Sequence, residues 1–277
     1  MPLAFYSRAA TQEFWSEHWG GQDVPGLLRV ARGSPLTALI EAALPAGGRM
    51  LEAGCGLGQY VVLLRERGRA VIGADWSLDA LRRGRAAAPA TPFAVMDLAR
   101  LALGPGALDA YISLGVVEHD PGGPDAIVAE AARVLAPGGR LVLSVPYWNG
   151  ARRLTAPYLL REARRLRAAG GQFYQFAFSR REMRAFLEAH GFHVLRFHPY
   201  DPARLFRGAV RRWLPLALDG DVAAAGAPTT RGGPFVDQVG DHVGAPRRLR
   251  GVLKRLLYSP PALRLFAHMI LAVAVKR

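Results

Sequence analysis

A glycine-rich turn that follows an acidic residue is the part of this sequence best suited to bind a ligand. The stretch Met50–Tyr60 reads Met-Leu-Glu-Ala-Gly-Cys-Gly-Leu-Gly-Gln-Tyr, and its glycines alternate at positions 54, 56 and 58. Glycine lets backbone amides approach a ligand more closely than a residue with a side chain would allow. The dinucleotide fingerprint G-x-G-x-x-G would need its third glycine one position later, where Gln59 stands.

Aspartates end two later segments that read as strands. Ala70–Asp75 is an apolar run closed by an acid, which is the pattern of a buried parallel strand. Asp75 lies 21 residues after Gly54, near the spacing at which an acid meets ribose hydroxyls in a βαβ nucleotide site. A carboxylate only accepts hydrogen bonds and therefore suits a vicinal diol. Pro92–Leu98 reads as a third short strand containing Asp97, although a helix N-cap is the alternative role of either aspartate.

The spacing E-x-G-x-G-x-G from Glu52 to Gly58 closely resembles the S-adenosylmethionine (SAM) turn of class I methyltransferases. Two further segments follow in the order typical of that family. Leu108–His119 supplies a fourth strand and its loop, and Val134–Pro146 supplies a helix end, a Pro-Gly-Gly turn and a fifth strand. The resemblance covers residues 45–200 well. It implies an α/β fold with a doubly wound, mostly parallel seven-stranded sheet, helices on both faces and the last strand antiparallel.

The same resemblance assigns residues to the cofactor. In the family, the acid after the third strand accepts a hydrogen bond from the adenine amino group, and the loop after the fourth strand lies under the sulfonium. Trp76 is expected to cover the adenine face. The residues expected to bind SAM are Glu52, Gly54, Gly56, Gly58, Asp75, Trp76, Asp97, Leu98 and Leu114.

Methyl transfer from SAM requires alignment of the reacting atoms and exclusion of water, and a base is optional. The chain lacks the Asn/Asp-Pro-Pro-Tyr/Phe loop of amino-group methyltransferases and a second cysteine for cytosine C5 chemistry. Its Val116–His119 ending resembles small-molecule methyltransferases, including the quinone-biosynthesis O-methyltransferase group. His119 is therefore the candidate catalytic residue, as a base or for substrate orientation. The alternative is a structural histidine at the head of the next helix.

Aromatic residues outside the glycine turn are expected to form the walls of the substrate site. They lie in an aromatic N-terminal segment, directly after the fifth strand, where open α/β sheets bind ligands, and in the segment after that. An aromatic pocket suits a flat or lipophilic acceptor, and core packing is the alternative role of each ring. The candidates are Trp15, Trp19, Tyr147, Trp148 and Tyr174.

The chain is expected to be a single methyltransferase domain over residues 1–277. Within it we expect an N-terminal helical cap over 1–45, a lid segment over 147–178 and an insertion over 201–262 before the last strand. The insertion contains a stretch rich in Ala, Gly and Pro, Gly220–Gly233, which is expected to be flexible.

Five strands alternating with helices over residues 50–146 predict a parallel sheet. Ser179, with Glu182 three residues later, predicts a capped helix. The other predicted elements are helices over Leu36–Leu44 and Pro157–Ala169, an extended aromatic piece over Phe173–Phe178, a sixth strand over Phe192–Phe197, and a last buried strand over Ala267–Val275.

Neither a leader nor a membrane span is expected. Met1–Ala10 lacks the pattern of a signal peptide, and the longest late apolar run, 269–275, is shorter than the ~20 residues of a membrane span. A single cysteine excludes an intramolecular disulfide and fits a reducing compartment, so the expected location is cytoplasmic. The seven histidines are scattered, so no metal site is expected.

The formal net charge of +14 comes almost entirely from arginine, because only Lys254 and Lys276 are lysines among 36 basic residues. A solvated helix face is the ordinary explanation, and an anionic substrate, RNA or an anionic membrane surface are the alternatives. The basic residues cluster in 152–167, 180–184, 207–212 and 247–255.

These features predict a SAM-dependent methyltransferase acting on a small molecule, with O-methylation preferred. Nucleic acid is not favoured as a partner, and peripheral contact with a membrane is left open. The alternatives are an RNA or lipid methyltransferase recruited by the arginine clusters, and a non-catalytic SAM-binding scaffold protein.

Overall fold

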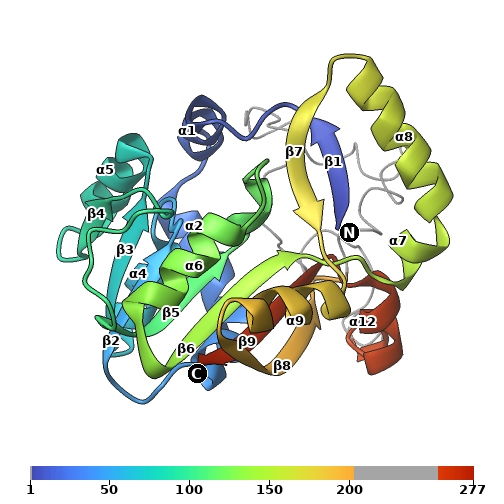
Figure 1. Ribbon diagram of the computed structural model, residues 1–277. Coiled ribbons are helices and arrows are strands. Elements are labelled where there is room, and N and C mark those ends of the chain that lie inside the picture. Colours follow the sequence, from blue (N-terminus) through green and yellow to red (C-terminus); the bar gives the residue numbers. More distant parts are fainter. Residues whose placement is uncertain (1, 203–254) are drawn as a thin grey trace.

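The main element of the fold is a seven-stranded sheet in the order β4-β3-β2-β5-β6-β9-β8 (Figure 1). This computed structural model describes residues 2–202 and 255–277. The sheet positions the loops that follow its strands at one edge, where ligands bind in open α/β folds. Its strands are β2 (Arg49–Ala53), β3 (Ala70–Asp75), β4 (Phe93–Val95), β5 (Leu108–Leu114), β6 (Leu135–Pro146), β8 (Phe192–Tyr200) and β9 (Met269–Lys276).

The direction of the strands confirms the predicted sheet. The five neighbouring strands β4, β3, β2, β5 and β6 pair in parallel. β9 lies between β6 and β8 and runs antiparallel to both. β9 is buried along most of its length, as expected for a strand with a neighbour on each side. The predicted apolar strand over 267–275 is therefore confirmed, and it lies inside the sheet.

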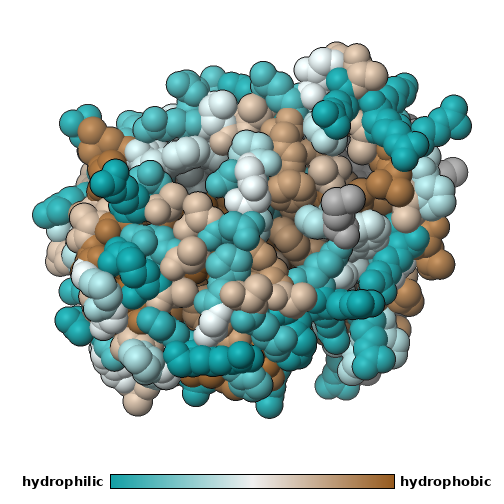
Figure 2. Space-filling model, in the orientation of Figure 1, coloured by the Kyte–Doolittle hydropathy of each residue, from teal (hydrophilic) through white to brown (hydrophobic). Residues whose placement is uncertain are grey.

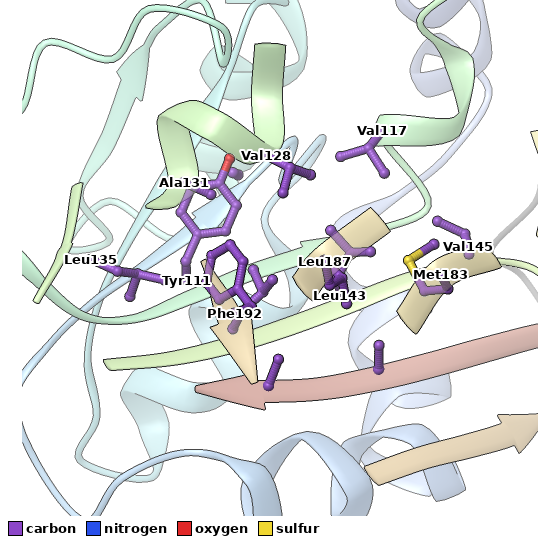
Figure 3. Packing of buried hydrophobic residues seen from close by; sticks show 14 of the residues in the cluster. Tyr111, Val117, Val128, Ala131, Leu135, Leu143, Val145, Met183, Leu187 and Phe192 are labelled. Atoms are coloured by element: carbon purple, nitrogen blue, oxygen red, sulfur yellow. The ribbon is translucent and has the colours of Figure 1, made fainter. Parts of the chain in front are cut away.

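Helices cover both faces of the sheet (Figure 1). Buried residues of α6 (Asp125–Val134) and α9 (Arg180–Ala189) pack on one face together with Tyr111, Leu143 and Phe192. Figure 3 shows this cluster, in which the labelled side chains of both helices lie among those of the strands. The other face packs against α2 (Val24–Gly33), α3 (Pro35–Ala43) and α4 (Gln59–Glu66), and α5 (Leu78–Ala87) adds Leu81 to that cluster.

A second, two-stranded sheet stands apart from the main one. β1 (Leu3–Ser7) pairs antiparallel with β7 (Gln172–Ala177), and the helix α8 (Ala156–Ala168) lies beside it (Figure 1). The segment expected to be a helical cap therefore begins with a strand, which is followed by α1 (Gln12–Gly20), α2 and α3. The short α7 (Gly150–Leu154) precedes α8.

Most predicted elements appear with small shifts at their ends. Ser179 and Glu182 form the predicted capping box of α9, because each side chain accepts from the backbone amide of the other. The predicted third strand is shorter than expected, and Asp97 lies in the turn after it. α12 (Pro260–Phe266) begins inside the predicted insertion, 201–262, and ends beyond it. Residues 203–254 of that insertion, with Gly220–Gly233 among them, lie outside the described residues.

No helix among the described residues combines the length and the apolar character needed to cross a bilayer.

Phe192, the first residue of β8, is fully buried in the core. We expect Phe192→Ala to lower the free energy of unfolding by roughly 3–5 kcal/mol, because it leaves a cavity between α6, α9 and the sheet. Leu195→Ala on the same strand is the control, since Leu195 is exposed and should cost less than about 1 kcal/mol. Urea unfolding curves measure both, and equal losses would contradict this packing.

Candidate active site

The glycine turn after β2 has the backbone conformation that its sequence predicts. Gly54, Gly56 and Gly58 have φ of 77°, 55° and 78°, in the left-handed region that favours glycine. Gly58 is the N-cap of α4. A Cβ at each position would overlap a neighbouring side chain, namely Val116 at Gly54, Trp19 at Gly56 and Phe93 at Gly58.

Asp75 at the end of β3 holds this turn. Its Oδ2 accepts from the amide of Gly56 at 2.8 Å, and its Oδ1 accepts from the amide of Ser77 at 2.9 Å. Burial raises the pKa of Asp75, while the hydrogen bonds from these amides act in the opposite direction. Asp75 therefore fixes the glycine turn against the start of α5 and presents a carboxylate at the sheet edge. Ser77, not Asp75, caps α5.

A cavity of about 320 Å³ opens at the carboxyl ends of β2, β3 and β5. It brings together residues that come from distant parts of the chain. The residues predicted for the cofactor that line it are Glu52, Gly54, Asp75, Trp76, Asp97, Leu98 and Leu114. The residues predicted for chemistry or substrate that line it are His119, Trp15 and Trp19.

The other predicted site residues lie outside the lining of this cavity. Gly56 and Gly58 lie beneath Trp19 and Phe93. Tyr147 and Trp148 are held beyond β6, where their amides donate to the backbone of two neighbouring segments. Tyr174 does not line the cavity, but it contacts His119, which does.

His119 lines the cavity and is the last residue of a 3-10 helix, Val117–His119. Its ring lies between those of Trp15 and Tyr174, with centroids 5.0 and 5.1 Å away. His119 Nδ1 is 2.8 Å from the carbonyl oxygen of Tyr174. Because a carbonyl only accepts, Nδ1 carries the proton and Nε2 is the free acceptor of the ring. Burial lowers the pKa of His119 to about 4, so the imidazole is neutral at physiological pH.

Glu118 was noted in the sequence only as part of a pattern. It is 1% exposed, and its Oε1 is 3.9 Å from Nε2 of His119, too far for a hydrogen bond. Burial raises the pKa of Glu118 to about 8, so the carboxyl is mainly protonated at neutral pH. Nothing in the sequence around Glu118 indicated that its carboxyl would be buried.

Three buried acceptors on residues that line the cavity lack hydrogen-bond partners among the described residues. They are Oε2 of Glu52, Oε1 of Gln59 and Nε2 of His119. Burial raises the pKa of Glu52 to about 8. Buried polar atoms without partners are uncommon in folded proteins, and ligand sites are one place where they occur. Gln59 was missed as a site residue, although its place in the first turn of the helix after the glycines was a usable signal.

Comparison with known proteins agrees with this geometry. Residues 51–143 match the family model of a methyltransferase domain. A curated relative from Mycolicibacterium smegmatis, named as a probable S-adenosylmethionine-dependent methyltransferase, is 36% identical over 103 residues. This match covers 36% of the chain and 39% of the relative, so the chain spans about two fifths of that relative's length.

Solved structures share this fold at low sequence identity. The geranyl diphosphate C-methyltransferase of Streptomyces coelicolor matches with a TM-score of 0.57 at 17% identity, over 97% of this chain and 100% of that one. An S-adenosylmethionine-dependent methyltransferase from Mesorhizobium loti matches with a TM-score of 0.54 at 17% identity, over 89% and 100%. Residues 51–143 thus match a methyltransferase domain, and the fold is the Rossmann-like fold of solved SAM-dependent methyltransferases.

The burial of Glu118 makes stability depend on pH. A carboxyl with a pKa near 8 in the folded state and 4.5 when unfolded stabilises the fold below about pH 4.5, and this contribution is lost as pH rises through about 8. We expect Glu118→Gln to lack that loss, so its free energy of unfolding relative to wild type should rise over this window. Urea unfolding from about pH 5 to about pH 9 tests this.

The exposed Glu66, changed to Gln, controls for the removal of one carboxylate from the surface. A difference between Glu118→Gln and wild type that stays constant with pH would mean that Glu118 is ionised in the folded protein.

Proposed function

We propose that this protein is a SAM-dependent methyltransferase that acts on a small molecule, with a hydroxyl oxygen as the preferred acceptor. The observation that supports this most is that one cavity is lined by two chemically different sets of residues. The first set is the glycine turn with the acids Asp75 and Asp97, and the second is the neutral imidazole of His119. The first suits a nucleoside cofactor and the second suits a proton acceptor.

The residues of the first set fit SAM by the chemistry of their donors and acceptors. Asp75 and Asp97 offer carboxylates, which suit ribose hydroxyls and the adenine amino group respectively. The unpartnered acceptors of Glu52 and Gln59 suit the amino group of the methionine part. Trp76, exposed beside the cavity, suits the adenine face. When bound, SAM supplies a methyl group already activated by its sulfonium charge.

Apolar side chains complete the site. Leu98 and Leu114 line the cavity, and Trp15 and Trp19 close it from the N-terminal side with rings 6.3 Å apart. These walls exclude water and favour a flat or lipophilic acceptor. In this proposal, alignment within the cavity is the main contribution to the rate.

His119 is proposed to accept the proton that the acceptor hydroxyl loses. The Tyr174 carbonyl fixes the ring with Nδ1 protonated, which leaves the lone pair of Nε2 for that proton. The acceptor hydroxyl would become more acidic as its oxygen gained the methyl group and the bond from that methyl to the sulfur of SAM broke, and its proton would pass to Nε2 and from there to water. The lowered pKa keeps the imidazole in its accepting form at neutral pH.

The role of Asp75 is tested by its removal. We expect Asp75→Ala to weaken binding of S-adenosylhomocysteine by about 1–3 kcal/mol, because a diol loses its acceptor and the glycine turn loses its anchor. Asp79→Ala removes an exposed acid on α5 and is the control, and titration calorimetry compares every variant with wild type. Asp75→Asn is the milder change, because it keeps one acceptor oxygen for one of the two amides and loses the other. Unchanged affinity in both Asp75 variants would put the ribose partner elsewhere.

The reaction itself is tested with SAM labelled on its methyl group and a pool of small-molecule extracts, with labelled products identified by mass spectrometry. With an acceptor so found, we expect His119→Ala to reduce turnover by roughly 10²–10⁴-fold with little change in cofactor affinity. His190→Ala is the matched control, since its Nδ1 also meets a backbone carbonyl, that of Phe186, but it lies outside the cavity.

Two outcomes would overturn this proposal. Binding of SAM with no methyl transfer to any acceptor in the pool would favour the alternative of a non-catalytic SAM-binding scaffold protein. Full turnover in a destabilised His119→Ala protein, judged from its melting curve, would make the residue structural and leave alignment as the mechanism.

A further inference from the structure

The outer face of α7 and α8 combines exposed apolar side chains with arginines, and we call it the α7–α8 edge. Leu154, Tyr158 and Leu160 are 80%, 68% and 42% exposed. Neither helix contains a buried residue. Figure 1 places these helices at the border of the molecule beside the small sheet, and Figure 2 shows hydrophilic and hydrophobic side chains mixed along that border.

Helical spacing places the two kinds of side chain on the same face. Within α8, Tyr158, Arg161 and Arg165 follow one another at intervals of three and four residues, which is one stripe along the helix, and the exposed Leu154 ends α7 just before it. The opposite side of α8 is half-buried, and the helix packs against β1. The apolar residues of the outer stripe are therefore not part of the core.

The charge of the α7–α8 edge is strongly positive. Glu162 is the only acid of α7 and α8, and it pairs with Arg165 at 3.1 Å. The other exposed arginines have no acidic partner among the described residues; they are Arg153, Arg161, Arg164 and Arg167. A surface of this charge attracts anions.

The mixture of the two kinds of side chain distinguishes between anionic partners. A nucleic acid would neutralise the arginines through its phosphates but would leave exposed leucines in contact with a charged backbone. The surface of an anionic membrane offers headgroup phosphates to the arginines and the acyl boundary to the apolar side chains. Arginine also carries an aliphatic stem that lies well along such a boundary.

We propose that the α7–α8 edge binds peripherally to membranes that contain anionic lipids. The proposal goes beyond methyl transfer and does not depend on the acceptor. The edge is one layer away from the cavity, because α8 packs on β1, β1 pairs with β7, and Tyr174 of β7 bonds to His119.

Co-sedimentation of the full chain with vesicles tests this. We expect binding to vesicles of phosphatidylglycerol and phosphatidylcholine in equal parts, little binding to phosphatidylcholine alone, and release by high salt. The double variant Arg161→Glu with Arg164→Glu should weaken binding by at least about tenfold. The pair Leu154→Ser with Tyr158→Ser should also weaken it, because both kinds of contact are needed.

Matched controls carry the same changes elsewhere. Arg82→Glu with Arg85→Glu alters exposed arginines of α5, and Leu195→Ser alters an exposed leucine of β8. Both controls should bind vesicles like wild type. All changed positions are exposed, so melting temperatures near that of wild type are expected and are measured alongside.

The proposal fails if the wild type does not bind the anionic vesicles, or if the α5 variant loses as much binding as the α8 variant. It also fails if the leucine–tyrosine variant binds vesicles normally. A different result would make the α7–α8 edge a nucleic-acid surface. In that case the wild type would bind single-stranded RNA but not vesicles, the arginine variant would lose RNA binding, and the leucine–tyrosine variant would keep it.

Discussion

The amides of Gly56 and Ser77 donate to the two carboxylate oxygens of Asp75, and the rest of the site is arranged around these bonds. They join the turn after β2 to the start of α5, across two neighbouring parallel strands. Glycines with positive φ make this approach sterically allowed, and Trp19 and Phe93 fill the space that Cβ atoms would take. The cost of burying a carboxylate is offset by these hydrogen bonds.

Burial acts in opposite directions on the titratable groups around the cavity. It keeps His119 neutral by lowering its pKa, and it keeps Glu118 and Glu52 mainly protonated by raising theirs. The interior therefore carries less charge at neutral pH than the residue types suggest. Such a site suits the removal of a proton from an acceptor close to the sulfonium of the proposed cofactor.

Local patterns predicted the parts of the molecule that depend on local interactions. The β3 strand ending in Asp75 and the capping box of Ser179 and Glu182 appear as predicted, because burial and capping act within a few residues. The pairing of β1 with β7 was not predictable, since it joins segments more than 160 residues apart through backbone hydrogen bonds that leave no sequence signature. The bond between His119 and the Tyr174 carbonyl depends on that pairing. It was missed for the same reason.

The position of β9 has a consequence for how the chain folds during synthesis. β9 lies between β6 and β8 but follows both of them in the sequence. Until residues 269–276 have left the ribosome, β6 pairs only with β5 and β8 has no partner in the sheet, so both present open edges that other chains can pair with. The sheet closes only through contacts with β6 more than a hundred residues away in sequence, and such pairings form slowly. Chaperones that shield unpaired strands would therefore matter most for this protein before β9 is inserted.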